Sequence, residues 1–189
     1  MVNDIRRRLR DASQADHQKL EGRLDIFSKV RTLEGRRGLA QGFYALHAGA
    51  EVQLAPLIAD LPGLDFEARR RTPILRRDLA TLEAATPPAA DCRPFADAAS
   101  ALGMLYVLEG STLGARVIRR ELQARGEDMA GLGFLDPYGD EVGERWRACV
   151  AVLEREAAAP RDAEAMIAGA VDGFRHVQQV LCGAEALAS

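Results

Sequence analysis

Cysteine and histidine are both scarce in this chain, with only 3 of each among 189 residues. The cysteines Cys92, Cys149 and Cys182 are widely separated, and none belongs to a Cys-x-x-Cys or Cys-x-x-Cys-His motif. No two histidines are three or four residues apart, the spacing of a metal-binding helix face. The sequence therefore gives no support for a zinc site, a redox dithiol or a covalently attached cofactor, and it favours a reducing compartment.

Long apolar runs and an excess of one charge are also missing. The formal net charge is −3, so no overall attraction to nucleic acid or to an anionic membrane is expected. The N-terminal sequence Met-Val-Asn-Asp-Ile-Arg lacks the apolar stretch of a signal peptide, and we expect no membrane-spanning segment. These features predict a soluble, cytoplasmic protein.

Motifs of nucleotide-binding proteins and hydrolases are absent too: there is no Gly-x-Ser-x-Gly elbow, no Walker loop and no Gly-x-Gly-x-x-Gly after a strand. Any redox chemistry would then draw its electrons from another protein. Alternation typical of β-strands is not found either, whereas helical periodicity is frequent. We predict one all-α domain over residues 1–189, with helices near 3–27, 33–60, 65–86, 100–126, 140–158 and 162–187. Thr32 is the expected cap of the second helix, Pro73 lies within the third, and Pro160 is expected to separate the last two.

The predicted helix 100–126 contains an unusual stripe of glycines. Gly103, Gly110 and Gly114 lie within about 40° of one another around the helix axis. Each glycine costs a helix roughly 0.5–1 kcal/mol relative to alanine, so a stripe of them needs a reason. Close packing of a second helix is one explanation, and close approach of a flat ligand is the other.

A second candidate site lies on the first predicted helix. Arg10, Ser13, His17 and Leu24 share one stripe, with Leu20 at its edge. An imidazole among leucines, two turns from a guanidinium, suits a metal-containing ligand with a carboxylate at its other end. A half-buried histidine beside an unrelated surface arginine fits the same pattern. His47 and His176 are expected to be ordinary helix residues.

Arginines occur in three clusters, at 6–10, 36–37 and 69–77. Solvated helix faces explain most such clusters, and a docking surface for an acidic protein partner is the second interpretation.

Two motifs together resemble the heme oxygenase family, in particular its bacterial branch. The first is Leu-Arg-Asp-Ala-Ser-Gln-Ala-Asp-His-Gln-Lys-Leu-Glu at 9–21, and the second is Leu-Tyr-Val-Leu-Glu-Gly-Ser-Thr-Leu-Gly-Ala at 105–115. A weaker match is Phe-Leu-Asp-Pro-Tyr-Gly at 134–139 with Trp146 downstream. The resemblance implies a multi-helical fold in which heme b lies between a proximal and a distal helix.

The resemblance also implies a role for individual residues. His17 matches the proximal ligand of the heme iron, and Gly110 and Gly114 match the distal helix that approaches the opposite heme face. Arg10 and Tyr106 stand where heme propionates are contacted.

Two positions depart from the family pattern. Ser111 occupies the place of an aspartate in animal-type members, within the distal group that orders water. Ala115 replaces the second glycine of a common Gly-Gly pair, where its methyl group would reduce the space above the heme.

The family's reaction is cleavage of heme with O2 and external electrons to biliverdin, iron and carbon monoxide. Its implied partners are an electron donor such as a ferredoxin or flavin reductase and, from the wording of residues 108–114, a bacterial phytochrome as biliverdin acceptor. Two alternatives stay open: a non-catalytic heme- or bilin-binding sensor or carrier with the same fold, and a helical interaction module that uses the glycines for packing.

Overall fold

The computed structural model describes residues 4–183, and within them it contains seven α-helices, three short 3₁₀ turns and no strand. The predicted all-α class is therefore confirmed. The helices are α1 (Ile5–Arg23), α2 (Ile26–Lys29), α3 (Leu33–Ile58), α4 (Thr72–Thr81), α5 (Ala98–Ala124), α6 (Val142–Glu156) and α7 (Pro160–Cys182). The 3₁₀ turns are η1 (Glu67–Arg69), η2 (Gly133–Leu135) and η3 (Gly139–Glu141).

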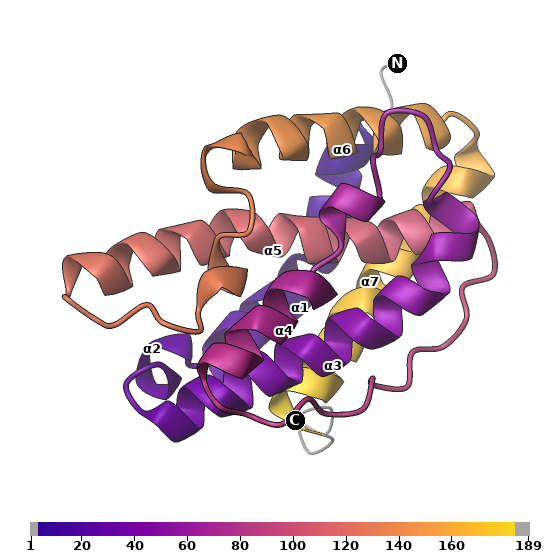
Figure 1. Cartoon of the computed structure of the whole chain (residues 1–189). Coiled ribbons are helices and arrows are strands. Elements are labelled where there is room, and N and C mark those ends of the chain that lie inside the picture. Colours follow the sequence, from indigo (N-terminus) through magenta and orange to yellow (C-terminus); the bar gives the residue numbers. More distant parts are fainter. Residues whose placement is uncertain (1–3, 184–189) are drawn as a thin grey trace.

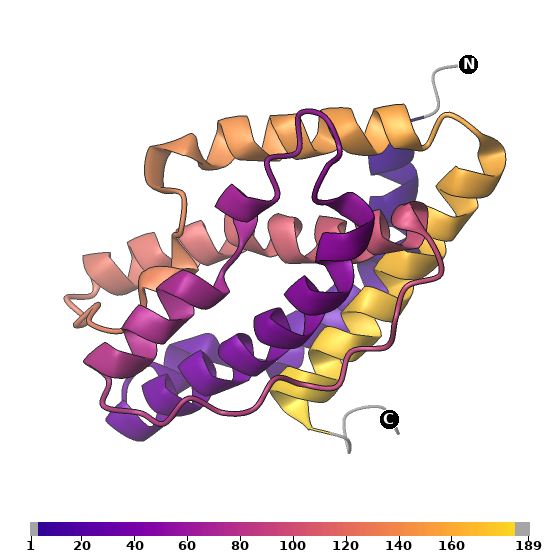
Figure 2. The ribbon, with the colours of Figure 1, turned by 45° about the vertical axis from the view of Figure 1, so that its right-hand side comes forward.

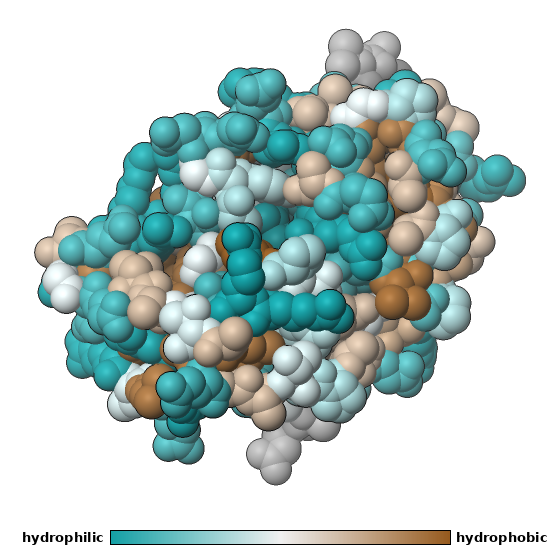
Figure 3. All heavy atoms as spheres, in the orientation of Figure 1, coloured by the Kyte–Doolittle hydropathy of each residue, from teal (hydrophilic) through white to brown (hydrophobic). Residues whose placement is uncertain are grey.

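Helix α5 runs through the middle of the molecule and organises the other helices. It crosses α7, while α6 lies along one side of it and α3 along another (Figures 1 and 2). Helix α1 packs on α7 as well, so α7 holds α1 and α5 in a common frame. The view in Figure 3 shows a mostly hydrophilic surface with scattered apolar residues, as expected for a folded domain in water.

Most predicted helices are found, and their ends differ from the prediction where side chains cap the backbone. The first helix was expected to continue to residue 27, but Asp25 accepts a hydrogen bond from the Ser28 backbone N–H and begins the separate helix α2. Thr32 caps α3 as predicted. The segment 65–86 is helical only as η1 and α4. Pro73 lies in the first turn of α4, the position that proline tolerates, so α4 begins there as a separate helix.

The last helix also begins earlier than expected. Pro160 was predicted to separate two helices but lies in the first turn of α7. The predicted end of this helix at residue 187 lies outside the described residues.

Two apolar clusters form the interior. The larger joins α1, α3, α5, α6 and α7, and the smaller joins α2, α3, α4, the end of α5 and the 3₁₀ turn η2. Side chains from both clusters face a pocket between them, including Val107 and Phe174 from the larger cluster and Leu24, Leu75 and Phe134 from the smaller.

The three glycines of the predicted stripe do different things. A Cβ atom on Gly103 would lie 2.1 Å from the Met166 carbonyl oxygen, so this glycine permits close contact between α5 and α7. Gly169 of α7 has the same role on the other side of this contact, since a Cβ there would lie 2.2 Å from the Ser100 carbonyl oxygen. Around Gly114 there is no atom within 4 Å of the same position. Helix packing therefore explains Gly103 but not Gly114.

One described helix, α5, is long and apolar enough to cross a membrane by length and composition, contrary to the expectation that no segment would be. Half of its most apolar stretch is buried inside the fold.

Candidate functional site

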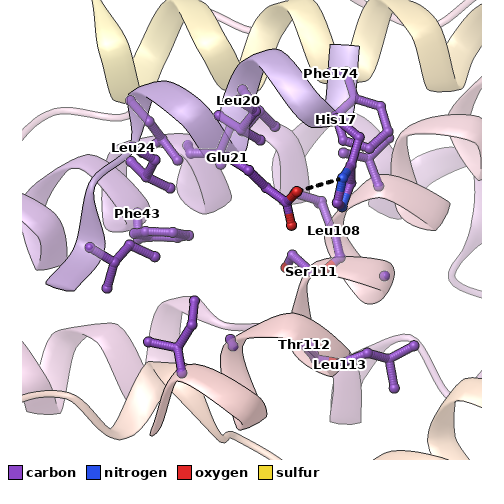
Figure 4. Close-up of a pocket in the computed structure, with 18 of the residues that line it drawn as sticks. His17, Leu20, Glu21, Leu24, Phe43, Leu108, Ser111, Thr112, Leu113 and Phe174 are labelled. Atoms are coloured by element: carbon purple, nitrogen blue, oxygen red, sulfur yellow. Dashed lines mark hydrogen bonds and ion pairs between the residues drawn. The ribbon is translucent and has the colours of Figure 1, made fainter. Parts of the chain in front are cut away.

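A large pocket, with a volume of about 1120 Å³, separates α1 from the middle of α5. Figure 4 shows part of it, with His17, Glu21 and Leu24 on one side and Leu108, Ser111 and Thr112 on the other. Its volume slightly exceeds the roughly 300–1,000 Å³ typical of pockets for small organic ligands. Its inner wall is largely apolar, formed by Leu20, Leu24, Phe27, Phe43, Leu46, Leu75, Ile118, Phe134, Leu135, Phe174, Val177 and Leu181.

His17 presents its imidazole to this pocket from α1. Its Nδ1 lies 3.4 Å from Glu21 Oε2, one turn further along the same helix, and the ring makes an edge-on contact with Phe174 at 5.6 Å between centroids (Figure 4). The side chain is 52% exposed, so a ligand entering the pocket can reach it. A carboxylate on Nδ1 holds the proton there and leaves the Nε2 lone pair for a metal ion, a common arrangement for histidine ligands.

The α5 wall of the pocket includes Ser111, Ala115 and Ile118, which follow one another at helical spacing. The Ser111 hydroxyl donates a hydrogen bond to the Leu108 carbonyl oxygen at 2.6 Å. Gly110 also lines the pocket, and a Cβ on it would lie 3.8 Å from the Trp146 ring. Gly114 is exposed and is not among the lining residues, so the face turned to the pocket is centred on Ser111 and Ala115 rather than on the glycine stripe.

Arg10 and Tyr106 line the pocket from α1 and α5. The Arg10 guanidinium is exposed and is hydrogen-bonded to Asp11 at 3.1–3.2 Å. The Tyr106 ring packs against Trp146 at 5.8 Å between centroids, and burial raises the pKa of its hydroxyl. His17, Arg10, Tyr106, Gly110, Ser111 and Ala115 thus all line one pocket, and their roles toward a ligand stay a prediction.

His47, expected from the sequence to be an ordinary helix residue, lines the pocket. It lies on α3 and is only 6% exposed. Burial, aided by the positive charge of Arg71, lowers the pKa of His47 to about 3. Glu51 Oε1 lies 3.9 Å from His47 Nδ1, but its two oxygens already accept bonds from Arg70, from the Arg71 and Thr72 backbone and from the Thr72 hydroxyl. The imidazole is therefore neutral at physiological pH.

Glu109 anchors a second buried group behind the α5 wall. It pairs with Arg69 at 2.5 Å and with Arg71 at 3.4 Å, and it accepts a hydrogen bond from the Tyr138 hydroxyl at 2.7 Å. Burial and the Glu109 charge raise the pKa of Tyr138. Solvated helix faces were the predicted role of most arginines, and for Arg69 and Arg71 this was wrong, since they are 4% and 5% exposed.

One sequence signal could have pointed to these polar residues. His47 and Glu51 stand four residues apart on an otherwise apolar helix face, a spacing at which side chains interact. Arg69 and Arg71 carried no comparable signal, because their partner Glu109 belongs to a distant segment.

No family model matches the chain. A heme oxygenase from Xanthomonas campestris pv. campestris (strain 8004) is 42% identical over 145 residues, which are 73% of this chain and 83% of that protein. Among solved structures, the NO- and CO-bound heme oxygenase from Neisseria meningitidis superposes with a TM-score of 0.75 over 95% of this chain and 90% of that one, at 23% identity. The second similarity establishes the fold, and the first, with its extent and identity, shows that the chain belongs to the heme oxygenase family.

Proposed function

We propose that this chain is a heme-degrading monooxygenase, which binds heme between α1 and α5 and cleaves it with O2 and external electrons to biliverdin, iron and carbon monoxide. One observation carries the proposal: the imidazole of His17 and the Ser111–Ala115 face of α5 line the same pocket. A flat ligand in that pocket would have a nitrogen ligand on one face and helix backbone near the other.

The pocket suits an amphiphilic porphyrin such as heme b. Apolar side chains cover the inner wall, where the ring and its vinyl groups would lie, and Arg10 and Tyr106 offer a guanidinium and a hydroxyl to the propionates. His17 would hold the iron through Nε2, with Glu21 keeping the ring oriented. Heme, when bound, supplies the iron that activates oxygen and is itself the substrate.

The chain's own residues would position the ring, restrict space and order water. Gly110, Ser111 and Ala115 bring α5 close to the ring with small side chains, which would limit the directions from which its edge is attacked. Gly114, outside the lining, would keep this part of α5 narrow. Because Ser111 bonds its own helix, it offers its oxygen to water as an acceptor.

His47 adds a neutral imidazole at the inner wall, which can accept one hydrogen bond and donate another. His47 and Arg71 would together hold water on the inner side of the pocket. They would thereby order water in a protein whose α5 carries Ser111 instead of an aspartate.

Partners and location follow from the same proposal. The chain holds no flavin or iron–sulfur motif, so electrons would come from a ferredoxin or a flavin reductase. The protein would act in the cytoplasm, and a bacterial phytochrome is a candidate acceptor of the biliverdin.

The test is incubation of the purified protein with hemin, a reductant and oxygen while the absorption spectrum is followed. We expect loss of the Soret band together with the appearance of a bilin. The His17→Ala variant should lose turnover, whereas His176→Ala, a matched change on α7 outside the pocket, should retain it. Unchanged turnover in His17→Ala would identify another ligand.

A heme- or bilin-binding sensor or carrier is the second candidate. Ser111 and Ala115 favour it, because they replace an aspartate and a glycine of the family pattern. It predicts tight binding of hemin and a complex that persists under reductant and oxygen. Formation of bilin in the same assay would exclude it.

A further inference from the structure

Arg36, in the first turns of α3, connects the end of α5 to the turn between α2 and α3. Its Nε donates to the Val30 carbonyl oxygen at 2.5 Å, and its Nη1 donates to Asp128 Oδ2 at 3.2 Å. Its Nη2 lies 3.7 Å from Glu127 Oε2. The Arg36 side chain is 11% exposed, so these bonds form around a largely buried guanidinium.

Both carboxylates are placed by the way α5 ends. Gly126 has a φ of +75°, which turns the chain back, and the Glu127 backbone N–H then donates to the Leu122 carbonyl oxygen at 3.0 Å. Leu122 is 1% exposed and belongs to the smaller apolar cluster. Arg125, one residue earlier, places its guanidinium 4.9 Å from the Phe27 ring centroid. Glu127 and Asp128 are therefore attached to the end of α5 and should follow its position.

The other side of this contact moves with the α1 wall of the pocket. Leu24, which follows α1, and Ile26 and Phe27, which begin α2, all line the pocket, and Val30 follows α2 directly. Arg36 thus bridges the segment that ends the α1 wall and the segment that ends the α5 wall. At the opposite end, both walls are packed on α7, where Gly103 and Gly169 fix the crossing.

Between these two attachments much of α5 faces solvent or the pocket, and Arg116 connects it to η3 through a hydrogen bond to Asp140 at 2.9 Å. Ser111, Gly114, Val117 and Arg120 are exposed, and Ala115 and Ile118 face the pocket. The separation of the two walls along this stretch depends on how its ends are held.

We propose that Arg36 is a positioning residue, which sets the separation of α1 and α5 and thereby the grip of the pocket on its flat ligand. The inference rests on the proposed function, since heme is the ligand. A guanidinium suits the task because its planar fork serves a carbonyl and two carboxylates at once, which a lysine ammonium cannot do in the same geometry.

The first test measures hemin dissociation, by transfer of hemin from the loaded protein to excess apomyoglobin. Arg36→Ala should release hemin about three- to tenfold faster. The expected effect is smaller than that of losing a buried charged hydrogen bond, because Asp128 is exposed and water weakens its attraction to Arg36. Arg36→Lys should restore only part of the loss. The Soret maximum should shift in Arg36→Ala, because the space around the ring changes.

Arg37→Ala is the matched control. The neighbouring Arg37 also donates its Nε to a backbone carbonyl, that of Leu82 at 2.7 Å, but this bond joins α3 to the end of α4, and Arg37 does not line the pocket. Its hemin dissociation and Soret maximum should match the wild type. Equal effects in the two variants, or an unchanged rate in Arg36→Ala, would overturn the proposal.

A second variant covers the case in which Arg36→Ala fails to fold. Glu127→Gln combined with Asp128→Asn keeps the bond from Arg36 to Val30 and removes only the charges on the α5 side. It should accelerate hemin release in the same direction, and an unchanged rate would contradict the proposal.

Amide hydrogen exchange of the ligand-free protein separates this inference from the proposed function. Backbone amides at 118–127 should exchange faster in Arg36→Ala than in Arg37→Ala, whether or not hemin is degraded. Absence of hemin binding by the wild type would reject the proposed function, whereas equal exchange in the two variants would reject the role of Arg36.

Discussion

At the scale of single residues, the informative feature is the pair of buried polar groups around the pocket. His47 is neutral because burial and Arg71 disfavour its imidazolium form, and the Glu109 carboxylate lies between Arg69 and Arg71. A substitution at His47 and a substitution at Glu109 test these two assignments separately.

His47 should make the protein sensitive to acid. Its pKa is about 3 in the folded state and near 6.5 in the unfolded chain, so between these values only the unfolded chain binds the proton. The free energy of unfolding should therefore fall as the pH is lowered through 6.5, by about 2–3 kcal/mol at about pH 4.5 from this residue.

Urea denaturation of His47→Gln at neutral and acidic pH measures this contribution. The variant should lose less stability on acidification than the wild type. His176→Gln is the control, since burial lowers the pKa of His176 against the opposing charge of Asp91, and its effect should be smaller. Identical pH dependence in His47→Gln and the wild type would contradict the assignment.

Glu109→Gln should destabilise the fold strongly. Removing the charge leaves the buried guanidinium groups of Arg69 and Arg71 without their carboxylate, and breaking a buried pair in this way costs about 3–5 kcal/mol. Chemical denaturation at neutral pH gives the value. Glu141→Gln, which removes an exposed partner of Arg145, serves as control and should stay close to the wild type.

At the scale of elements, α5 combines two roles along its length. Its first turns are locked to α7 through Gly103, and its later turns border the pocket with open space at Gly114. Two glycines of one sequence pattern therefore lie in different environments: Gly103 is packed against α7, and Gly114 faces open space.

Alanine substitutions should separate the two environments. Gly103→Ala should destabilise the protein by about 3 kcal/mol or more, because the new methyl group would overlap backbone of α7. Gly114→Ala should fold normally and stabilise α5 by up to about 1 kcal/mol, since its methyl group meets open space. Thermal unfolding of the two variants without hemin checks this, and equal losses would show that α5 is packed differently.

At the scale of the whole molecule, the pocket lies between two apolar clusters and is lined by both. A ligand in it would therefore contact both halves of the interior. Because the unfolded chain has no such site, binding should be coupled to folding of the whole domain.

Saturating hemin should raise the thermal unfolding midpoint. At a free concentration of about 100 times the Kd, the added free energy of unfolding is about 2.7 kcal/mol. The increase should be smaller in His17→Ala, which lacks the imidazole that faces the pocket, and should be retained in His176→Ala. A midpoint that does not change with hemin would contradict binding in this pocket.

Local sequence determined much of this protein. Helical periodicity and the Thr32 cap predicted an all-α chain with nearly the right helices, because the interactions that form a helix join residues one turn apart. The same periodicity placed Arg10, Ser13 and His17 on one face of α1, with Leu24 directly after it, and all four line the pocket.

Only the tertiary structure decided which charges are buried and which small residues are packed. Arg69 and Glu109 are 40 residues apart, and Arg36 meets Asp128 across 92, so no local pattern could pair them. Gly103 and Gly114 look alike in the sequence, but one faces the backbone of α7 and the other open space. The free energy of such contacts depends on which segments meet and how much water they exclude, and that is settled only when the helices pack.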